Sequence, residues 1–270
     1  MKRFFPHVPL ALVGLFFCFP FIWMISTSLK SLPDATALPV KLLPNPLHWE
    51  NYVLAFERVP YLRYAINTVL LTSVSVIAYV LSSPLVAYTI SKIDWAGRKI
   101  LFPLILASML LPIQVTMVPL FMVFNKLGWI GTFKPLIVPA FMGGAFYIFL
   151  LRQFFLTIPD SLFESARIDG AREGVVYLKI ALPLCKPALT TVAIFAFLSV
   201  WSDFLGPLIY LTKKEMYTLS IGLQSYKFEH YIEWNLLMAA AAMFTVPIII
   251  LYFFAQKRFV EGIATTGLKG

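Results

Sequence analysis

The sequence is poor in charged residues, and this shortage excludes the ordinary classes of water-soluble protein. Only 13% of its 270 residues are charged and 60% are hydrophobic, whereas soluble domains carry about 25% charged residues. So few charges cannot cover the apolar surface of a soluble globule. The 25 Phe and 12 Tyr exclude a disordered chain. The solvent that suits this composition is lipid.

Cysteine and histidine are also scarce, which limits the disulfides, metal sites and proton-transfer groups that this chain can form. Cys18 lies in an apolar run and Cys185 in a loop, so we expect neither a disulfide framework nor a metal site. The histidines, His7, His48 and His230, lie outside the apolar runs, which excludes an intramembrane haem or a histidine proton relay. No phosphate-binding Gly-x-x-x-x-Gly-Lys-[Ser/Thr] loop occurs. We therefore expect no catalytic residue and no enzyme activity in this chain.

What the sequence has is long apolar runs. Six are long enough to cross a bilayer as helices, and they are continuous rather than alternating, which excludes a barrel. We therefore predict an all-α integral membrane protein with six transmembrane helices, the first being a retained span rather than a signal peptide. The predicted spans are Val8–Thr27, Tyr64–Ser91, Ile100–Asn125, Pro135–Leu151, Ala188–Leu211 and Leu236–Ala255.

Prolines lie inside several of these spans. A kinked span favours a transporter, but membrane helices also tolerate proline because neighbouring groups satisfy the freed carbonyl. Both interpretations stay open at this point. The prolines concerned are Pro84, Pro103, Pro112, Pro119, Pro139, Pro207 and Pro247.

The basic residues orient the chain. The net charge is +9, but the Lys and Arg residues lie between apolar runs rather than in one patch, so we expect no nucleic-acid binding. One set of loops holds 13 of the 22 and the other set holds 9. By the positive-inside rule, this bias places both termini in the cytoplasm.

Two loops stand out by length. The first outer loop, about residues 28–63, contains Trp49 and Tyr52, which are either interfacial anchors or part of a docking surface for an outside partner. The inner loop, about residues 152–187, is the longest inner loop and carries charges of both signs.

The residue pattern of the inner loop predicts two short helices. Ser161 with Glu164 three residues later forms a capping-box pattern. Asp169-Gly170 is expected to end the first helix, and the second is predicted over residues 171–181, ending before Pro183. The predicted apolar face of the first helix comprises Leu162, Phe163 and Ala166.

The same loop resembles a known family. Glu164-Ser165-Ala166, then Gly170, then Ile180-x-Leu182-Pro183 is similar to the EAA signature of the integral-membrane subunits of binding-protein-dependent ABC importers. Ser165 replaces the central alanine, one small residue for another. Ile168–Ala171 resembles the carbohydrate-uptake branch, in particular the smaller permease of maltose-type systems. Further similar stretches are Trp201–Leu205, with Ser202 where the family more often has Asn, Phe259–Gly262 and Gly267–Gly270.

The resemblance implies a fold and an assembly. The fold would be that of a type I ABC importer permease, one transmembrane domain over residues 1–270 in the cell (inner) membrane, with cytoplasmic coupling helices. The implied partners are a second homologous permease, a cytoplasmic ATPase dimer that binds ATP and magnesium, and an extracytoplasmic solute-binding protein. The implied activity is import of a sugar by alternating access. The implied ATPase-coupling residues are Glu164, Ser165, Ala166, Asp169, Gly170, Ile180, Leu182 and Pro183.

Local roles compete with partner contacts at two of these positions. Glu164 would accept a bidentate bond from an arginine of the ATPase, or it would only close its own capping box. Asp169 would contact the partner, cap the second helix or pair with Arg172.

Polar residues within the predicted spans are candidates for the translocation path: Asn67, Gln114, Trp201, Ser202 and Asp203. Such residues are also ordinary interhelical hydrogen-bond partners. Asp203 is the only ionisable residue well inside a span, which keeps a proton-coupled secondary transporter as the alternative function.

Overall fold

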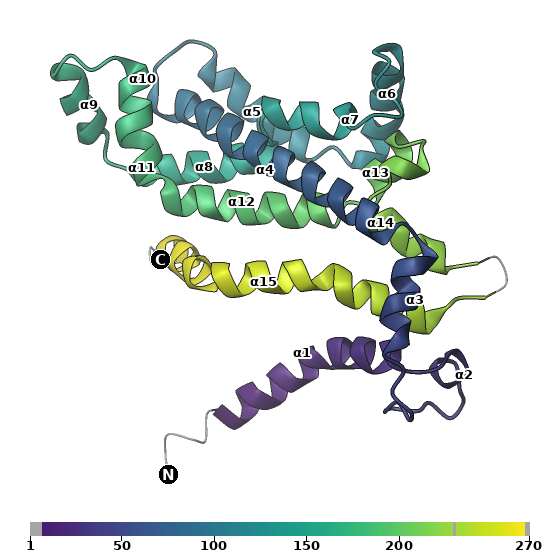
Figure 1. The fold of residues 1–270 in the computed structure, drawn as a ribbon. Helices are drawn as coiled ribbons and strands as arrows, with labels where there is room; N and C mark the ends of the chain where they lie inside the picture. Colours follow the sequence, from purple (N-terminus) through teal and green to yellow (C-terminus); the bar gives the residue numbers. More distant parts are fainter. Residues whose placement is uncertain (1–6, 229–230, 268–270) are drawn as a thin grey trace. The chain divides into compact units, whose positions relative to one another are not determined.

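A computed structural model describes residues 7–228 and 231–267, and this part of the chain is helical (Figure 1). An isolated antiparallel bridge pairs Lys227 with Ile232. The α-helices are α1 (His7–Ser28), α2 (Leu32–Ala35), α3 (Glu50–Arg58), α4 (Tyr61–Lys92), α5 (Arg98–Met109), α6 (Ile113–Lys126), α7 (Lys134–Ile137), α8 (Ala145–Thr157), α9 (Asp160–Ile168), α10 (Glu173–Val176), α11 (Leu182–Leu184), α12 (Lys186–Trp201), α13 (Leu205–Tyr210), α14 (Leu219–Gly222) and α15 (Trp234–Gly267).

Within the described residues, four helical stretches are long and apolar enough to cross a membrane: Ala11–Ser28, Tyr61–Lys92, Lys134–Thr157 and Trp234–Gln256. Two further pairs pass the same test together but are bent, which gives up to six spans if each pair is one span. The pairs are α5 with α6, bent by 105°, and Glu173–Leu184 with α12, bent by 76°.

The predicted span Ile100–Asn125 is therefore not one continuous helix, since a bend of 105° separates α5 from α6. α5 ends at Met109, and Pro112 precedes α6 with an extended backbone, φ −61° and ψ 140°. Proline has no N–H to donate to the preceding turn, and it disfavours helical geometry in the residue before it. At Pro112 the chain thus turns between two helices instead of kinking one.

Large apolar side chains cover the outside of the spanning helices. In α1, Leu12, Phe16 and Phe17 are 63%, 75% and 68% exposed. Large apolar side chains on every side of a helix are not expected to face water, because exposing apolar surface to water costs free energy. They are the lipid- or subunit-facing surface that the composition predicts.

The chain divides into two compact units. The first consists of residues 1–65 and 219–250, and the second of residues 66–218 and 251–270. In the first unit, Asn51 of α3 donates from Nδ2 to the backbone oxygens of Ser28 and Lys30, both at 2.8 Å. Arg58 forms an ion pair with Glu233 at 3.0 Å. These bonds fix the first outer loop against neighbouring helices of that unit.

The second unit contains the buried core that positions the inner loop. α8 packs against α5 and α12, and α9 against α10 (Figure 1). The core cluster contains the fully buried Leu151 and Phe155 of α8, Phe163 of α9 and Val192 of α12. Phe163 thereby joins the inner loop to the helical bundle.

Some sequence-based expectations fall outside the described residues. Lys2 and Arg3, His230 and residues 268–270 of the C-terminal match lie there, and for residues 257–267 only the backbone of α15 is described. Both thiols, Cys18 and Cys185, are free, as expected.

Candidate functional site

The inner loop folds as a short helix followed by a tight reversal. α9 ends at Ile168, and Gly170 follows with φ +82°, a conformation that favours glycine. The N–H of Ala171 donates to the oxygen of Ala166 at 2.9 Å, which closes the end of the helix. The break predicted at Asp169-Gly170 is confirmed.

The capping box is not formed. α9 begins at Asp160, after Pro159, so Ser161 lies inside the first turn rather than before it. Asp160 suits this position because a carboxylate stabilises the positive end of a helix. The described α9 has no side-chain cap. Glu164 is exposed, so its carboxylate faces outward from the loop.

The predicted apolar face of α9 is correct in part. Phe163 is buried and Ala166 packs against the core, but Leu162 is 47% exposed. The core contacts of this helix therefore centre on Phe163.

The second helix differs from the prediction. It begins at Glu173 rather than at residue 171, and it does not stop before Pro183. A π-helical turn, Tyr177–Ala181, joins α10 to α11, and Pro183 lies in the first turn of α11. Pro183 therefore lies within one continuous helical stretch, Glu173–Leu184, directly after the π-helical turn.

The pair of Asp169 with Arg172, one of the alternatives for Asp169, is not among the ion pairs of the described residues. The acid that pairs is Glu173, whose Oε1 lies 2.5 Å from Nε of Arg167. The Arg167 guanidinium holds the pKa of the Glu173 carboxyl below its usual range, and Glu173 in turn raises the pKa of Arg167. Sequence reasoning missed this pair because its spacing of six residues crosses the reversal at Gly170.

The implied coupling residues divide by exposure. Glu164, Ser165, Asp169, Gly170 and Pro183 are exposed, whereas the three remaining side chains are half-buried: Ala166, Ile180 and Leu182.

Apolar side chains that sequence reasoning did not single out lie on the same segment. Ile168, Leu178 and Val175 are 86%, 62% and 42% exposed. The available sequence signal was the presence of these apolar residues in a loop rich in charges, and their exposure is typical of a contact surface.

The second unit also contains a cavity of about 240 Å³. Its walls combine hydroxyl, carboxylate and apolar groups. The lining residues are Thr68, Leu71, Tyr79, Ile113, Leu136, Ser199, Val200, Asp203, Pro207 and Thr218.

Asp203 lines this cavity, and the structure explains its position. It lies between α12 and α13, and its Oδ1 accepts the N–H of Gly206 at 3.1 Å. The predicted span Ala188–Leu211 is thus interrupted at Asp203, which holds the start of α13. A Cβ on Gly206 would lie 2.4 Å from Oδ2 of Asp203, so the close approach requires glycine.

The other path candidates are not among the residues that line the cavity. Asn67 donates to the backbone oxygens of Glu215 and Tyr217, both at 2.9 Å. Gln114 is exposed at the start of α6. Trp201 is buried and stacks on Phe197 with ring centroids 5.2 Å apart.

Ser202 completes the list of path candidates. It is exposed at the end of α12, where its N–H donates to the oxygen of Leu198 at 3.2 Å. The cavity hydroxyls of Thr68 and Tyr79 were missed although they belong to a row at helical spacing along α4, Thr68, Thr72, Ser75 and Tyr79, which was the available signal. Ser199 is isolated among apolar residues of α12, so the sequence does not mark its face.

The comparisons with known proteins decide the family. A family model described as the binding-protein-dependent transport system inner membrane component matches residues 84–265. This chain belongs to that family. It is a multi-pass inner-membrane permease subunit of an ABC importer and not itself an enzyme, and the alternative of a proton-coupled secondary transporter is set aside.

Relatives and solved structures agree with this assignment along the whole chain. The arabinooligosaccharides transport system permease protein AraQ of Halalkalibacterium halodurans is 33% identical over 96% of this chain and 94% of its own. The trehalose/maltose transport system permease protein MalG of Thermococcus litoralis is 30% identical over 100% and 98%. A chain of a bacterial ABC transporter that imports the acidic polysaccharide alginate matches with a TM-score of 0.81 and 27% identity, over 95% and 96% of the two chains. The all-helical importer permease fold is confirmed.

Proposed function

We propose that this permease is one of two homologous membrane subunits of a sugar or oligosaccharide importer that works by alternating access. The names of the relatives support a carbohydrate as the solute, since arabino-oligosaccharides, trehalose and maltose appear in them. The energy comes from ATP, bound with magnesium on an ATPase dimer in the cytoplasm. A solute-binding protein delivers the sugar from outside.

The coupling segment, residues 160–184, is proposed to seat on the ATPase. Its exposed small residues, Ser165 and Gly170, permit close approach, and the exposed Ile168 and Leu178 offer apolar contact. The Glu164 carboxylate is exposed and is available to an arginine of the ATPase, which would bind it in bidentate geometry. The charge bias of the loops supports a cytoplasmic position for this segment and for both termini.

The cavity beside Asp203 is proposed as part of the sugar path. Hydroxyl groups of Thr68, Tyr79 and Ser199 and the Asp203 carboxylate line it together with apolar side chains. Sugars present hydroxyls at the ring edge and C–H groups on the ring face, so a mixed lining of this kind suits them.

The deciding experiment is a charge reversal at the exposed acid. Glu164→Lys, in the complete complex reconstituted into proteoliposomes, is expected to lower ATP-driven uptake of radiolabelled maltose or arabinotriose and to reduce co-purification of the ATPase. The control is Asp94→Lys, because Asp94 is another exposed acid on the same side, 89% exposed and paired with Arg98. Exposed ion pairs of this kind contribute about 1 kcal/mol or less.

Equal ATPase attachment and uptake in Glu164→Lys and wild type would refute the coupling role. Uptake by vesicles that contain this chain alone would refute the proposed dependence on an external ATPase.

A further inference from the structure

One helix connects the coupling segment to the cavity. α4 contributes Thr68, Leu71 and Tyr79 to the cavity lining, and its last turn ends at Lys92 beside α9. Tyr79 and Lys92 are 13 residues apart along the helix, about 20 Å at 1.5 Å per residue. All these residues belong to the second compact unit.

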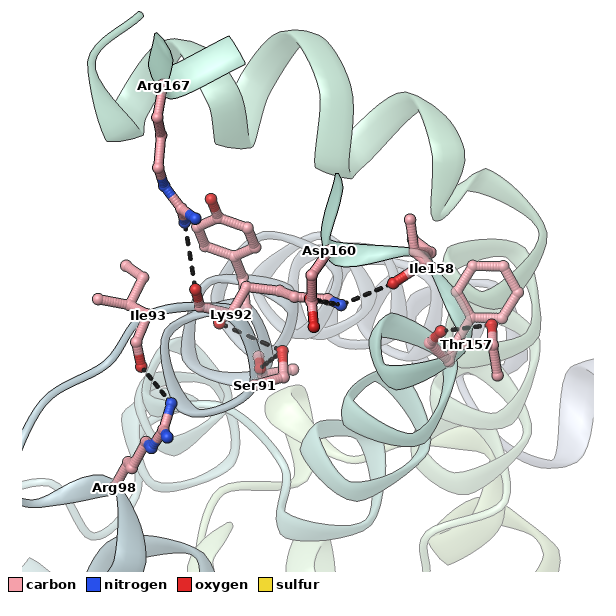
Figure 2. A network of polar contacts seen from close by, with 11 residues as sticks. Ser91, Lys92, Ile93, Arg98, Thr157, Ile158, Asp160 and Arg167 are labelled. Carbon is pink, nitrogen blue, oxygen red and sulfur yellow. Dashed lines mark hydrogen bonds and ion pairs between the residues drawn. The ribbon is translucent and has the colours of Figure 1, made fainter. Parts of the chain in front are cut away.

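The first attachment is the Lys92 side chain, which is only 3% exposed. Its Nζ donates to the backbone oxygen of Ile158 at 2.7 Å and to Oδ1 of Asp160 at 2.6 Å (Figure 2). It also lies 4.9 Å above the centre of the Phe163 ring. One buried cation therefore joins α4 to the end of α8 and the start of α9.

The second attachment runs through Arg167 at the end of α9. Its guanidinium donates to the backbone oxygen of Lys92 at 3.2 Å (Figure 2) and to Glu173 Oε1 at 2.5 Å. Glu173 Oε2 accepts the hydroxyl of Tyr88 at 2.8 Å. The Tyr88 side chain is buried, so this bond holds α10 against α4 at a fixed position.

We infer that these five residues, Tyr88, Lys92, Asp160, Arg167 and Glu173, form a latch that transmits movement of the coupling segment through α4 to the cavity. The inference rests on the proposed function. α9 and α10 are each held to the last turn of α4, so displacement of either helix displaces α4. All five hydrogen bonds involve a charged group and four are between 2.5 and 2.8 Å long, and such bonds are about twice as strong as neutral ones.

The test separates transmission from assembly. A reporter cysteine, Ser199→Cys in a Cys18→Ala background, is placed in the cavity wall of the complete complex. Its labelling by a membrane-impermeant maleimide is measured with and without ATP and vanadate, alongside ATP hydrolysis. With the intact latch we expect ATP-dependent labelling. Absence of hydrolysis and of any labelling change in this parent protein would refute the proposed function itself.

The latch variants are Lys92→Met, Glu173→Ala and Tyr88→Phe. Each is expected to hydrolyse ATP within about twofold of the parent, while the ATP-dependent rise in labelling falls roughly tenfold in the first two and less in the third. Lys92→Arg is expected to restore part of it. Asp94→Asn is the matched control, since its partner Arg98 does not contact the coupling segment through that pair, and it should behave as the parent.

Tyr88→Phe keeps the buried ring and removes only the hydroxyl. If Lys92→Met or Glu173→Ala prevents assembly of the complex, Tyr88→Phe still tests whether the latch transmits movement. An unchanged ATP-dependent rise in assembled Lys92→Met or in Tyr88→Phe would overturn the inference. The inference would also be overturned if every latch variant that lost ATP-dependent labelling lost ATP hydrolysis to the same extent.

Discussion

Phe163→Ala tests the anchorage of the coupling segment most directly. The Phe163 side chain is 1% exposed, its ring lies 6.1 Å from that of Tyr88, and the ammonium of Lys92 lies above it. Truncating a buried Phe costs about 3–5 kcal/mol, and loss of a cation–π contact adds about 0.5–2 kcal/mol. Because this ring is the fully buried side chain of α9, the cost falls on the attachment of that helix.

The assay is hydrogen exchange on the intact complex. A loss of 3 kcal/mol or more in local opening free energy speeds exchange of the α9 amides by about a hundredfold, since 1.4 kcal/mol is a factor of ten. The control is Leu162→Ala in the same helix, where the side chain is 47% exposed and the expected change is about 1 kcal/mol or less. Wild-type exchange of α9 in Phe163→Ala, or equal effects of the two variants, would refute the anchoring role.

Three shorter predictions follow from other parts of the second unit. Gly206→Ala would place a Cβ 2.4 Å from the Asp203 carboxylate and should lower uptake without loss of assembly, whereas Gly14→Ala, in α1 of the first unit and with open space at its Cβ, should leave uptake unchanged in the same assay. The depressed pKa of Glu173 means that its ion pair stabilises the fold above the ordinary carboxyl pKa, about 4.3, and is lost only as pH falls through the lower folded value. ATP-driven uptake should therefore show no titration from this pair between about pH 5.5 and 8, and a midpoint there that disappears in Glu173→Gln would contradict the assignment. Burial raises the pKa of the Cys185 thiol to about 12, so in Cys18→Ala membranes we expect no maleimide labelling until the protein is denatured.

The sequence predicts those features that depend on local chemistry. Apolar runs define the spans because a membrane helix needs about 20 such residues, and Gly170 marks the reversal because its backbone requires φ +82°. The break at Pro112 had a local signal too, but a proline inside an apolar run is compatible with either a kink or an end, and tertiary packing decides between them.

Features that depend on distant partners could not be predicted in the same way. Lys92 meets Ile158 and Asp160 across more than 60 residues of chain, and Tyr88 meets Glu173 across 85. Asp160, in the first turn of α9, is held by the same distant Lys92, a contact that the local pattern of Ser161 and Glu164 does not indicate. The cavity lining also depends on how α4, α12 and other segments pack together, which the spacing of hydroxyl residues along α4 alone does not determine.

The position of Asp203 bears on how the transporter avoids the cost of charge in a membrane. Its carboxylate accepts a bond from Gly206 and holds the start of α13, where the positive end of a helix favours a negative group. A carboxylate held in this way has a structural use that needs no proton transfer. Under the proposed function, the source of motion is the coupling segment, which is exposed at Glu164 and held through Lys92 to a cavity-lining helix. In that proposal Asp203 shapes the cavity and carries no proton.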